Sequence, residues 1–177
     1  DARVCDKTKD ELSGISLDGT DQTVPSFDEE LALVDGKVPL LVEIKQEIGE
    51  GDVASAVCRT LSRYSGAYIV ETFNPLALAK VKKLLPDARR GLLCDRFTTQ
   101  KKYKKPLYYL LQAFVLNFLC KPDFIAYNHK AKQGFSYKIV KNVFKTPLVA
   151  WTVRSKADEA QARRDGFKTV IFENYKA

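Results

Sequence analysis

Tyr68-Ile-Val-Glu-Thr-Phe73 is a short apolar run that leads directly into Asn74-Pro75 and a helical stretch, and Arg90-Gly-Leu-Leu-Cys94 follows that stretch. The first and last runs are rich in aliphatic, aromatic and β-branched residues, as strands are. Proline at the first helical position and Pro86 after the last turn mark the ends of the intervening helix. Residues 68–94 therefore predict a strand–helix–strand unit with parallel strands.

The same alternation of strand-like and helix-like segments extends over most of the chain. The strand candidates are residues 40–45, 68–73, 90–94, 124–128, 148–153 and 169–172. Helices are expected from Phe27 after an N-cap at Ser26, and at 52–64, 75–85, 107–120, 135–144 and 156–164. Because each strand candidate is almost continuously hydrophobic, we expect a parallel sheet covered on both faces. Residues 1–25 contain no strand candidate followed by a helix candidate, and we expect them to form an irregular excursion before the first helix.

Two arguments favour an α/β fold of the (β/α)8 TIM-type barrel over an open doubly wound sheet. No glycine-rich phosphate-binding turn follows any strand candidate. Polar side chains also gather at the C-terminal ends of the strands, where barrels keep their chemistry; they are Glu43, Lys45, Glu71, Asn128, Trp151, Thr152 and Glu173. A barrel needs eight strands. We therefore expect residues 1–177 to be a single barrel domain, incomplete at the N-terminus, with about six βα units and two further strands before Asp1.

The charge distribution restricts the classes of partner. The net charge is +7, but residues 1–52 carry a net charge of −9 and residues 80–105 a net charge of +8. The basic stretch has no helix-turn-helix, zinc-finger or RNA-recognition motif, and we predict no nucleic-acid partner. A solvated basic face and an attraction for phosphate or anionic lipid headgroups both remain open. Because the apolar positions of 107–120 cover more than one helical face, we expect residues 101–120 to contact a second subunit, as a homodimer, or an anionic membrane.

The remaining composition is that of a globular protein, with 45% hydrophobic residues. The longest apolar run, residues 113–120, is too short to span a bilayer, and the start does not resemble a secretory signal. Cys5, Cys58, Cys94 and Cys120 form no C-x-x-C pair. We expect buried or free thiols of a cytoplasmic protein that is at most peripheral to a membrane, although the spacing alone leaves a disulfide open.

The strongest candidate site lies in Leu41-Val-Glu-Ile-Lys45. Strand alternation places Glu43 and Lys45 on one face, which points inward near the mouth of a barrel. A buried carboxylate and ammonium are costly unless they meet a metal ion or a bound anion, and an internal ion pair between them is the alternative. Trp151, expected to face inward with Val149 and Val153, is either core or the apolar wall of a pocket.

His129 is the only histidine in the sequence, and it follows a strand. A single histidine without a nucleophile or second acid is more often a loop residue than a catalytic one, and we expect a loop residue. One histidine and these cysteine spacings also rule out a Ser-His-Asp arrangement or a zinc cluster.

Several strand ends together resemble one enzyme family. The matching segments are Pro39-Leu-Leu-Val-Glu-Ile-Lys45, Glu71-Thr-Phe-Asn-Pro75, Asp123-Phe-Ile-Ala-Tyr127, Ala150-Trp-Thr-Val153 and Thr169-Val-Ile-Phe-Glu-Asn174. In this order they resemble the strand motifs of the glycerophosphodiester phosphodiesterase family, over nearly all of the chain. The resemblance implies a (β/α)8 barrel of glycerol and lipid metabolism that hydrolyses glycerophosphodiesters to glycerol 3-phosphate and an alcohol, with a divalent cation, Mg²⁺ or Ca²⁺.

The resemblance also implies roles for individual residues. Glu43 matches a metal-ligand carboxylate, Lys45 the catalytic-site cation that binds the phosphate, and Trp151 a pocket-lining tryptophan. Asn128 and Glu71, at neighbouring strand ends, are further candidates for substrate binding. The family's H-R-G, E-x-D and H-D motifs have no match here, so the resemblance places both catalytic histidines before Asp1. The alternative function is a non-catalytic barrel that binds phosphorylated or anionic lipid ligands.

Overall fold

A computed structural model describes residues 4–46, 51–95, 117–131, 137–138, 142 and 146–176. Within these residues six strands form a single sheet, in chain order, and every neighbouring pair is parallel. The strands are β1 (Leu40–Glu43), β2 (Tyr68–Thr72), β3 (Arg89–Cys94), β4 (Phe124–Asn128), β5 (Leu148–Val153) and β6 (Thr169–Phe172). The predicted parallel sheet of six strands is confirmed.

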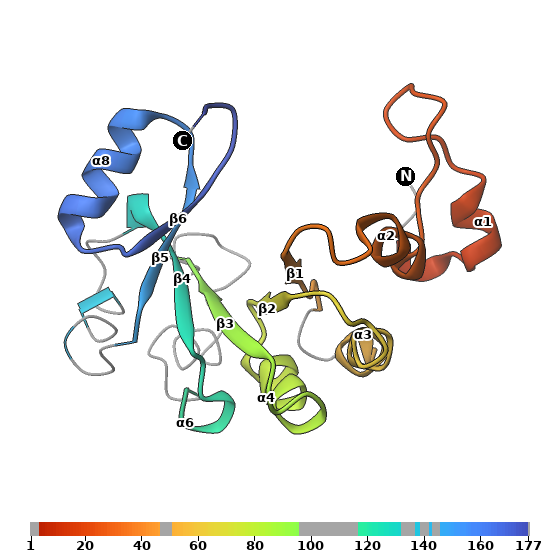
Figure 1. Cartoon of the computed structure of the whole chain (residues 1–177), viewed down its shortest axis with the longest axis horizontal. Helices are drawn as coiled ribbons and strands as arrows, with labels where there is room; N and C mark the ends of the chain where they lie inside the picture. Colours follow the sequence, from red (N-terminus) through yellow and green to blue (C-terminus); the bar gives the residue numbers. More distant parts are fainter. Residues whose placement is uncertain are drawn as a thin grey trace.

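Helices cover the outer face of the sheet, which curls from β1 round to β6 (Figure 1). They are α2 (Phe27–Val34), α3 (Val53–Leu61), α4 (Pro75–Leu84), α6 (Asn117–Cys120) and α8 (Lys156–Asp165). Side chains cap the N-termini of α2 and α4, because oxygens of Ser26 and Asn74 accept from the first free backbone N–H groups, and the cap at Ser26 is the one predicted. Of the helix predicted at 107–120, only α6 lies within the described residues, and most of 135–144 lies outside them.

Two buried clusters join the helices to the sheet. The first packs Ile44 and Val70 against α2, α3 and α4, and the second packs Ile125 and Ala150 against α8 and the end of α6. Burial of each large aliphatic side chain contributes about 1.5–3 kcal/mol. Because side chains alternate along a strand, the neighbours of these residues face the concave side of the sheet.

The edge strands are less covered than predicted. Leu41 on β1 is 42% exposed and Phe172 on β6 is 45% exposed, whereas the middle of β3 and β4 is buried. The prediction of a sheet covered on both faces therefore holds for the central strands and fails at the edges. Each edge strand has a neighbour on only one side within the described residues.

Val153 does not face inward with Trp151, contrary to the prediction. It is fully buried in the cluster that packs against the helices, together with Ala150. The register between β5 and β6 shifts between Ala150 and Val153. This irregularity breaks the two-residue alternation on which the prediction rested.

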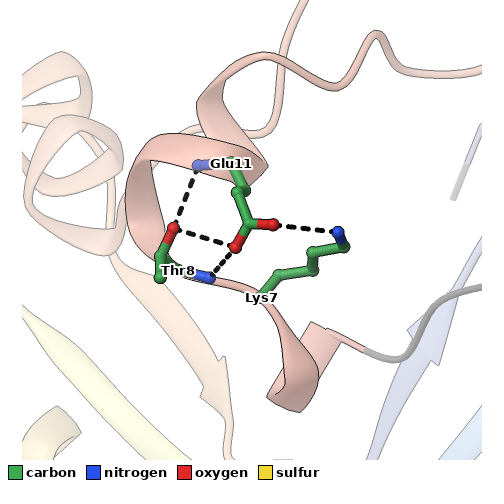
Figure 2. Close-up of polar contacts among 3 residues, drawn as sticks. All are labelled: Lys7, Thr8 and Glu11. Carbon is green, nitrogen blue, oxygen red and sulfur yellow. Dashed lines mark hydrogen bonds and ion pairs between the residues drawn. The ribbon is translucent and has the colours of Figure 1, made fainter.

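The excursion before α2 is more ordered than predicted. It contains a 3-10 turn at Val4–Asp6, the short helix α1 (Lys9–Ser13) and a bridge between Ser16 and Thr23. Figure 2 shows why α1 begins where it does: the Thr8 hydroxyl accepts from the backbone N–H of Glu11, and the Glu11 carboxylate accepts from the backbone N–H of Thr8. The Lys7 ammonium donates to the same carboxylate at 3.0 Å. Local side-chain chemistry thus orders a segment that buries none of the residues of α1.

Three of the four cysteines, Cys58, Cys94 and Cys120, are buried free thiols. Burial raises the pKa of each thiol, that of Cys120 to about 11. For these three residues the expectation of buried thiols is confirmed.

Candidate functional site

Two carboxylates meet at the C-terminal ends of β1 and β2. Glu43 and Glu71 are register partners on these parallel strands, and both alternate with residues of the outer core, so they share the concave face. Glu71 is only 4% exposed, and its Oε2 atom finds no hydrogen-bond partner among the described residues. Burial, and secondly the charge of Glu43, raises the pKa of Glu71 to about 7. A buried carboxyl beside a second one is costly unless a cation joins them.

Lys45 lies at the same edge, but in a different setting from the one predicted. Its Nζ atom is 3.9 Å from Oε2 of Glu43, and its side chain is 81% exposed, against 35% for that of Glu43. The expected burial of the ammonium is therefore wrong, and the ion pair between Glu43 and Lys45, which was the alternative, forms at an exposed position. Lys45 lies two residues beyond the end of the edge strand β1, which has a neighbouring strand on only one side in the described sheet. The carboxylate that is buried is Glu71.

The two carboxylates suit a divalent cation as partial ligands. No group of three or more histidine, cysteine, aspartate or glutamate side chains gathers closely enough to hold a metal within the part of the chain that the structure describes. Mg²⁺ commonly binds one or two carboxylates and completes its coordination with water and substrate phosphate. The unpartnered Oε2 of Glu71, next to Glu43, fits that pattern.

An aromatic pair reaches across the concave side of the sheet. The rings of Phe73, just after β2, and Trp151, on β5, meet edge to face with centroids 5.6 Å apart. The indole Nε1–H of Trp151 donates to the carbonyl of Ala126 at 2.9 Å. Both aromatic residues are only partly buried. Trp151 therefore stands at a strand end with part of its surface accessible, rather than being fully enclosed in the core.

Asn128 belongs to a polar pair beside these rings. It is the register partner of Trp151, and its amide Nδ2 donates to Oδ1 of Asp95 at 3.0 Å. Its Oδ1 accepts from the backbone N–H of Lys130. Both functional atoms of the amide are thus engaged, and the hydrogen bond holds the Asp95 carboxylate at the end of β3.

His129 is more buried than a loop residue was expected to be. It lies in a single 3-10 turn, His129–Ala131, directly after β4, and it is 7% exposed. Its Nε2 atom is buried without a hydrogen-bond partner among the described residues. The turn packs against β5. The expected position of His129 in a connecting segment is confirmed.

Sequence reasoning missed Phe73 and Asp95. Phe73 lies two residues after Glu71, and strand alternation carried one step further would have placed it on the same face. Asp95 directly follows a strand, as Glu43 and Asn128 close theirs. The rule that singled out polar strand ends would have found it as well.

Comparisons with known proteins identify the fold. No family model matches the chain, and no curated protein matches it. A glycerophosphodiester phosphodiesterase from Parabacteroides distasonis superposes with a TM-score of 0.70 at 18% identity, over 93% of this chain and 66% of that one. An Oleispira antarctica phosphodiesterase, solved with the product sn-glycerol-3-phosphate, superposes with a TM-score of 0.62 at 15% identity, over 85% and 57%.

The chain spans between 53% and 69% of the length of five such structures. The fold that the sequence motifs implied is thus confirmed as the fold of these phosphodiesterases, in the portion that the chain covers. No helix within the described residues is long and apolar enough to cross a membrane.

Proposed function

We propose that this chain, which shares its fold with glycerophosphodiester phosphodiesterases, belongs to that enzyme family and serves the hydrolysis of glycerophosphodiesters to glycerol 3-phosphate and an alcohol. The observation that carries the proposal is the meeting of Glu43, Glu71 and Lys45 at the C-terminal edge of such a sheet. Barrel enzymes place their chemistry at that edge. We further propose that the six strands are part of a (β/α)8 barrel.

A divalent cation, Mg²⁺ or Ca²⁺, is part of the proposal. Glu43 and Glu71 would hold it, because their neighbouring carboxylates carry the negative charge that hard cations bind. A bound cation stabilises negative charge on phosphoryl oxygens. In its absence the raised pKa of Glu71 keeps much of that carboxyl protonated near neutral pH.

Lys45 supplies a second positive centre. Its exposed ammonium stands near the Glu43 carboxylate, so a phosphate group bound to a cation at Glu43 would also come within its reach. An ammonium can follow the phosphate oxygens as their charge increases. The exposed side chain suits a group that closes onto a ligand better than one that supports the core.

The proposal is tested by ligand binding, because the acid–base motifs that the family resemblance implies have no match in residues 1–177. sn-Glycerol 3-phosphate is titrated calorimetrically into the chain with Mg²⁺, with Ca²⁺ or with a chelator. We expect binding that depends on the cation. We expect Glu43→Gln to weaken it at least tenfold, because the variant removes one of two ligand charges.

A matched control is Glu30→Gln, which removes an exposed carboxylate in the first turn of α2. It should bind as the unchanged chain does. If the affinity for sn-glycerol 3-phosphate is the same with and without the cation, and the same in Glu43→Gln, the proposed site is contradicted. Cation-independent binding of phosphorylated lipids would instead favour a non-catalytic barrel.

The partner proposal concerns the outer surface formed by α6 and the end of α4, which we call the α4–α6 surface. Phe118, Leu119 and Leu84 are 75%, 50% and 44% exposed there. The Lys82 ammonium donates to the carbonyl of Leu119 at 3.1 Å and so joins the two helices. Exposed apolar side chains beside lysines suit an anionic membrane. We propose peripheral membrane contact here; the remainder of the predicted segment, 101–116, lies outside the described residues.

A further inference from the structure

The segment that carries Lys45 is held by hydrogen bonds on both sides of that residue. On one side lies Ile44, which is 2% exposed and whose backbone N–H donates to the carbonyl of Glu71 at 2.8 Å. The carbonyl of Ile44 accepts from the hydroxyl of Thr72 at 2.7 Å. The residue directly before Lys45 is therefore fixed to β2 through both of its backbone polar groups.

Thr72 joins the end of β1 to the turn that follows β2. It is fully buried, and the hydroxyl that donates to Ile44 also accepts from the backbone N–H of Asn74 at 3.2 Å. The donor of the hydroxyl and one of its acceptor positions are thus used within the fold. A valine would fill a similar space and supply neither contact.

Gln46 holds the chain on the other side of Lys45 through two separate hydrogen bonds. Its side-chain Oε1 accepts from the backbone N–H of Ala54, in the first turn of α3, at 2.9 Å. Its backbone carbonyl accepts from Nδ2 of Asn74 at 3.2 Å. Asn74 is 5% exposed and is itself fixed as the N-cap of α4. Gln46 therefore ties the chain after Lys45 to the starts of α3 and α4.

Between these anchored neighbours the side chain of Lys45 is 81% exposed, with its Nζ atom 3.9 Å from Oε2 of Glu43. The side chain can change its rotamer while the backbone that carries it stays in place. Ordering a segment on a ligand costs conformational entropy, and a backbone that is already fixed removes its part of that cost. The two anchors therefore favour the binding of an anion by the Lys45 ammonium.

We propose that Gln46 is a positioning residue, which holds Lys45 where its ammonium reaches the phosphate group of the substrate, and that Thr72 does the same from the other side of Lys45. The inference rests on the proposed function, which assigns Lys45 to the phosphate. Gln46 needs no contact with the substrate, because it acts on the affinity through Lys45. Its effect should therefore disappear when the Lys45 ammonium is removed.

A double-mutant cycle measures this dependence. sn-Glycerol 3-phosphate is titrated calorimetrically, at saturating Mg²⁺, into the unchanged chain, Gln46→Met, Lys45→Met and the double variant. We expect Gln46→Met to weaken binding about fivefold, Lys45→Met about tenfold, and the double variant no more than about twofold beyond Lys45→Met. If Gln46→Met has no effect, or weakens binding about fivefold in the Lys45→Met background as well, the inference is overturned.

The affinity for Mg²⁺ alone separates a positioning role from general support of the fold. It should stay within about twofold of the unchanged chain in Gln46→Met, because the variant leaves the carboxylates of Glu43 and Glu71 in place. A loss of Mg²⁺ affinity as large as the loss of phosphate affinity would contradict the proposal. Gln161→Met, the same change at an exposed glutamine of α8, should bind both ligands as the unchanged chain does.

Thr72 provides a second test, which does not depend on the folding of Gln46→Met. Thr72→Ser keeps the hydroxyl and should bind sn-glycerol 3-phosphate as the unchanged chain does. Thr72→Val removes the hydroxyl and should weaken binding about fivefold, again only while Lys45 is present. Equal affinity in Thr72→Ser and Thr72→Val would overturn the inference, because the backbone at Lys45 would then not determine how the ammonium meets the phosphate.

The failure of this inference differs from the failure of the proposed function. If sn-glycerol 3-phosphate binds with Mg²⁺ but the effects of Gln46→Met and Lys45→Met are additive, the positioning role is removed and the phosphodiesterase site is kept. An unchanged affinity in Lys45→Met likewise removes the positioning role alone. If sn-glycerol 3-phosphate binds with neither Mg²⁺ nor Ca²⁺, the proposed function fails, and with it the inference that rests on it.

Discussion

Replacing Glu71 with glutamine should flatten the pH dependence of stability of the cation-free protein. Burial and the neighbouring Glu43 raise the pKa of Glu71 from 4.5 to about 7 in the folded chain. Between these pH values the folded state binds more protons than the unfolded state. The resulting stabilisation is fully present below about pH 4.5 and is lost as the pH rises through about 7.

The magnitude follows from the same pKa values. A rise from 4.5 to about 7 corresponds to roughly 3 kcal/mol of unfolding free energy. Glutamine introduces an amide that itself needs a partner, at a cost of about 1–3 kcal/mol. The informative quantity is therefore the change in stability between pH 5 and pH 8, rather than the stability at a single pH.

Urea unfolding followed by Trp151 fluorescence measures this change in the presence of a chelator. We expect the unchanged chain to lose roughly 2.5 kcal/mol from this group between pH 5 and pH 8, and Glu71→Gln to lack that loss. Glu30→Gln controls for the removal of a carboxylate as such. An equal pH dependence of the free energy of unfolding in the unchanged chain and in Glu71→Gln would refute the reasoning. The Glu71 carboxyl would then have the same pKa in the folded and the unfolded state.

Further predictions concern the stability of the sheet and its outer surface. Arg90→Met should lower the free energy of unfolding in urea by about 2–3 kcal/mol, because the Arg90 guanidinium donates to three backbone carbonyls, two between α4 and β3 and one at the end of α6. Arg89→Met, which changes a 75% exposed side chain, should lower it far less. Ser26→Ala removes the N-cap of α2 and should cost about 1 kcal/mol by the same measurement; no loss would mean that the cap is dispensable. Phe118→Ser, on the α4–α6 surface, and Lys83→Ala, at an exposed lysine in the last turn of α4, should each reduce co-sedimentation with phosphatidylglycerol vesicles. Neutral phosphatidylcholine vesicles should not support co-sedimentation. If the chain binds neither type of vesicle and light scattering shows a dimer, the α4–α6 surface would instead be assigned to contact with a second copy of the chain.

The elements with strong local signals could be predicted from the sequence. Ser26 and Asn74 cap their helices through side-chain oxygens, and Gly166 ends α8 in the left-handed conformation, so these boundaries depend on neighbouring residues only. The apolar strand runs likewise carry their own signal. The parallel sheet follows from their alternation with helices.

The candidate site could be predicted only in part, because its geometry depends on contacts between distant segments. Alternation placed Glu43 and Lys45 on one face, but it could not show that β1 is an edge strand whose last residues stay exposed. The contact between Phe73 and Trp151 needs the curvature that brings β2 towards β5. Val153 was misplaced because the register shift in β5 leaves no mark that we recognise in the sequence.

The order of the strands in the sheet has a consequence for how the chain reaches its fold during synthesis. Each strand from β2 onward pairs with the strand made immediately before it, and the register partners lie between 19 residues apart (Val153 and Phe172) and 33 residues apart (Gly91 and Phe124). From β2 onward, a nascent strand therefore finds one of its partners already translated when it leaves the ribosome. The sheet can be built vectorially, one repeat at a time, and after each addition the newest strand forms one of its two unpaired edges.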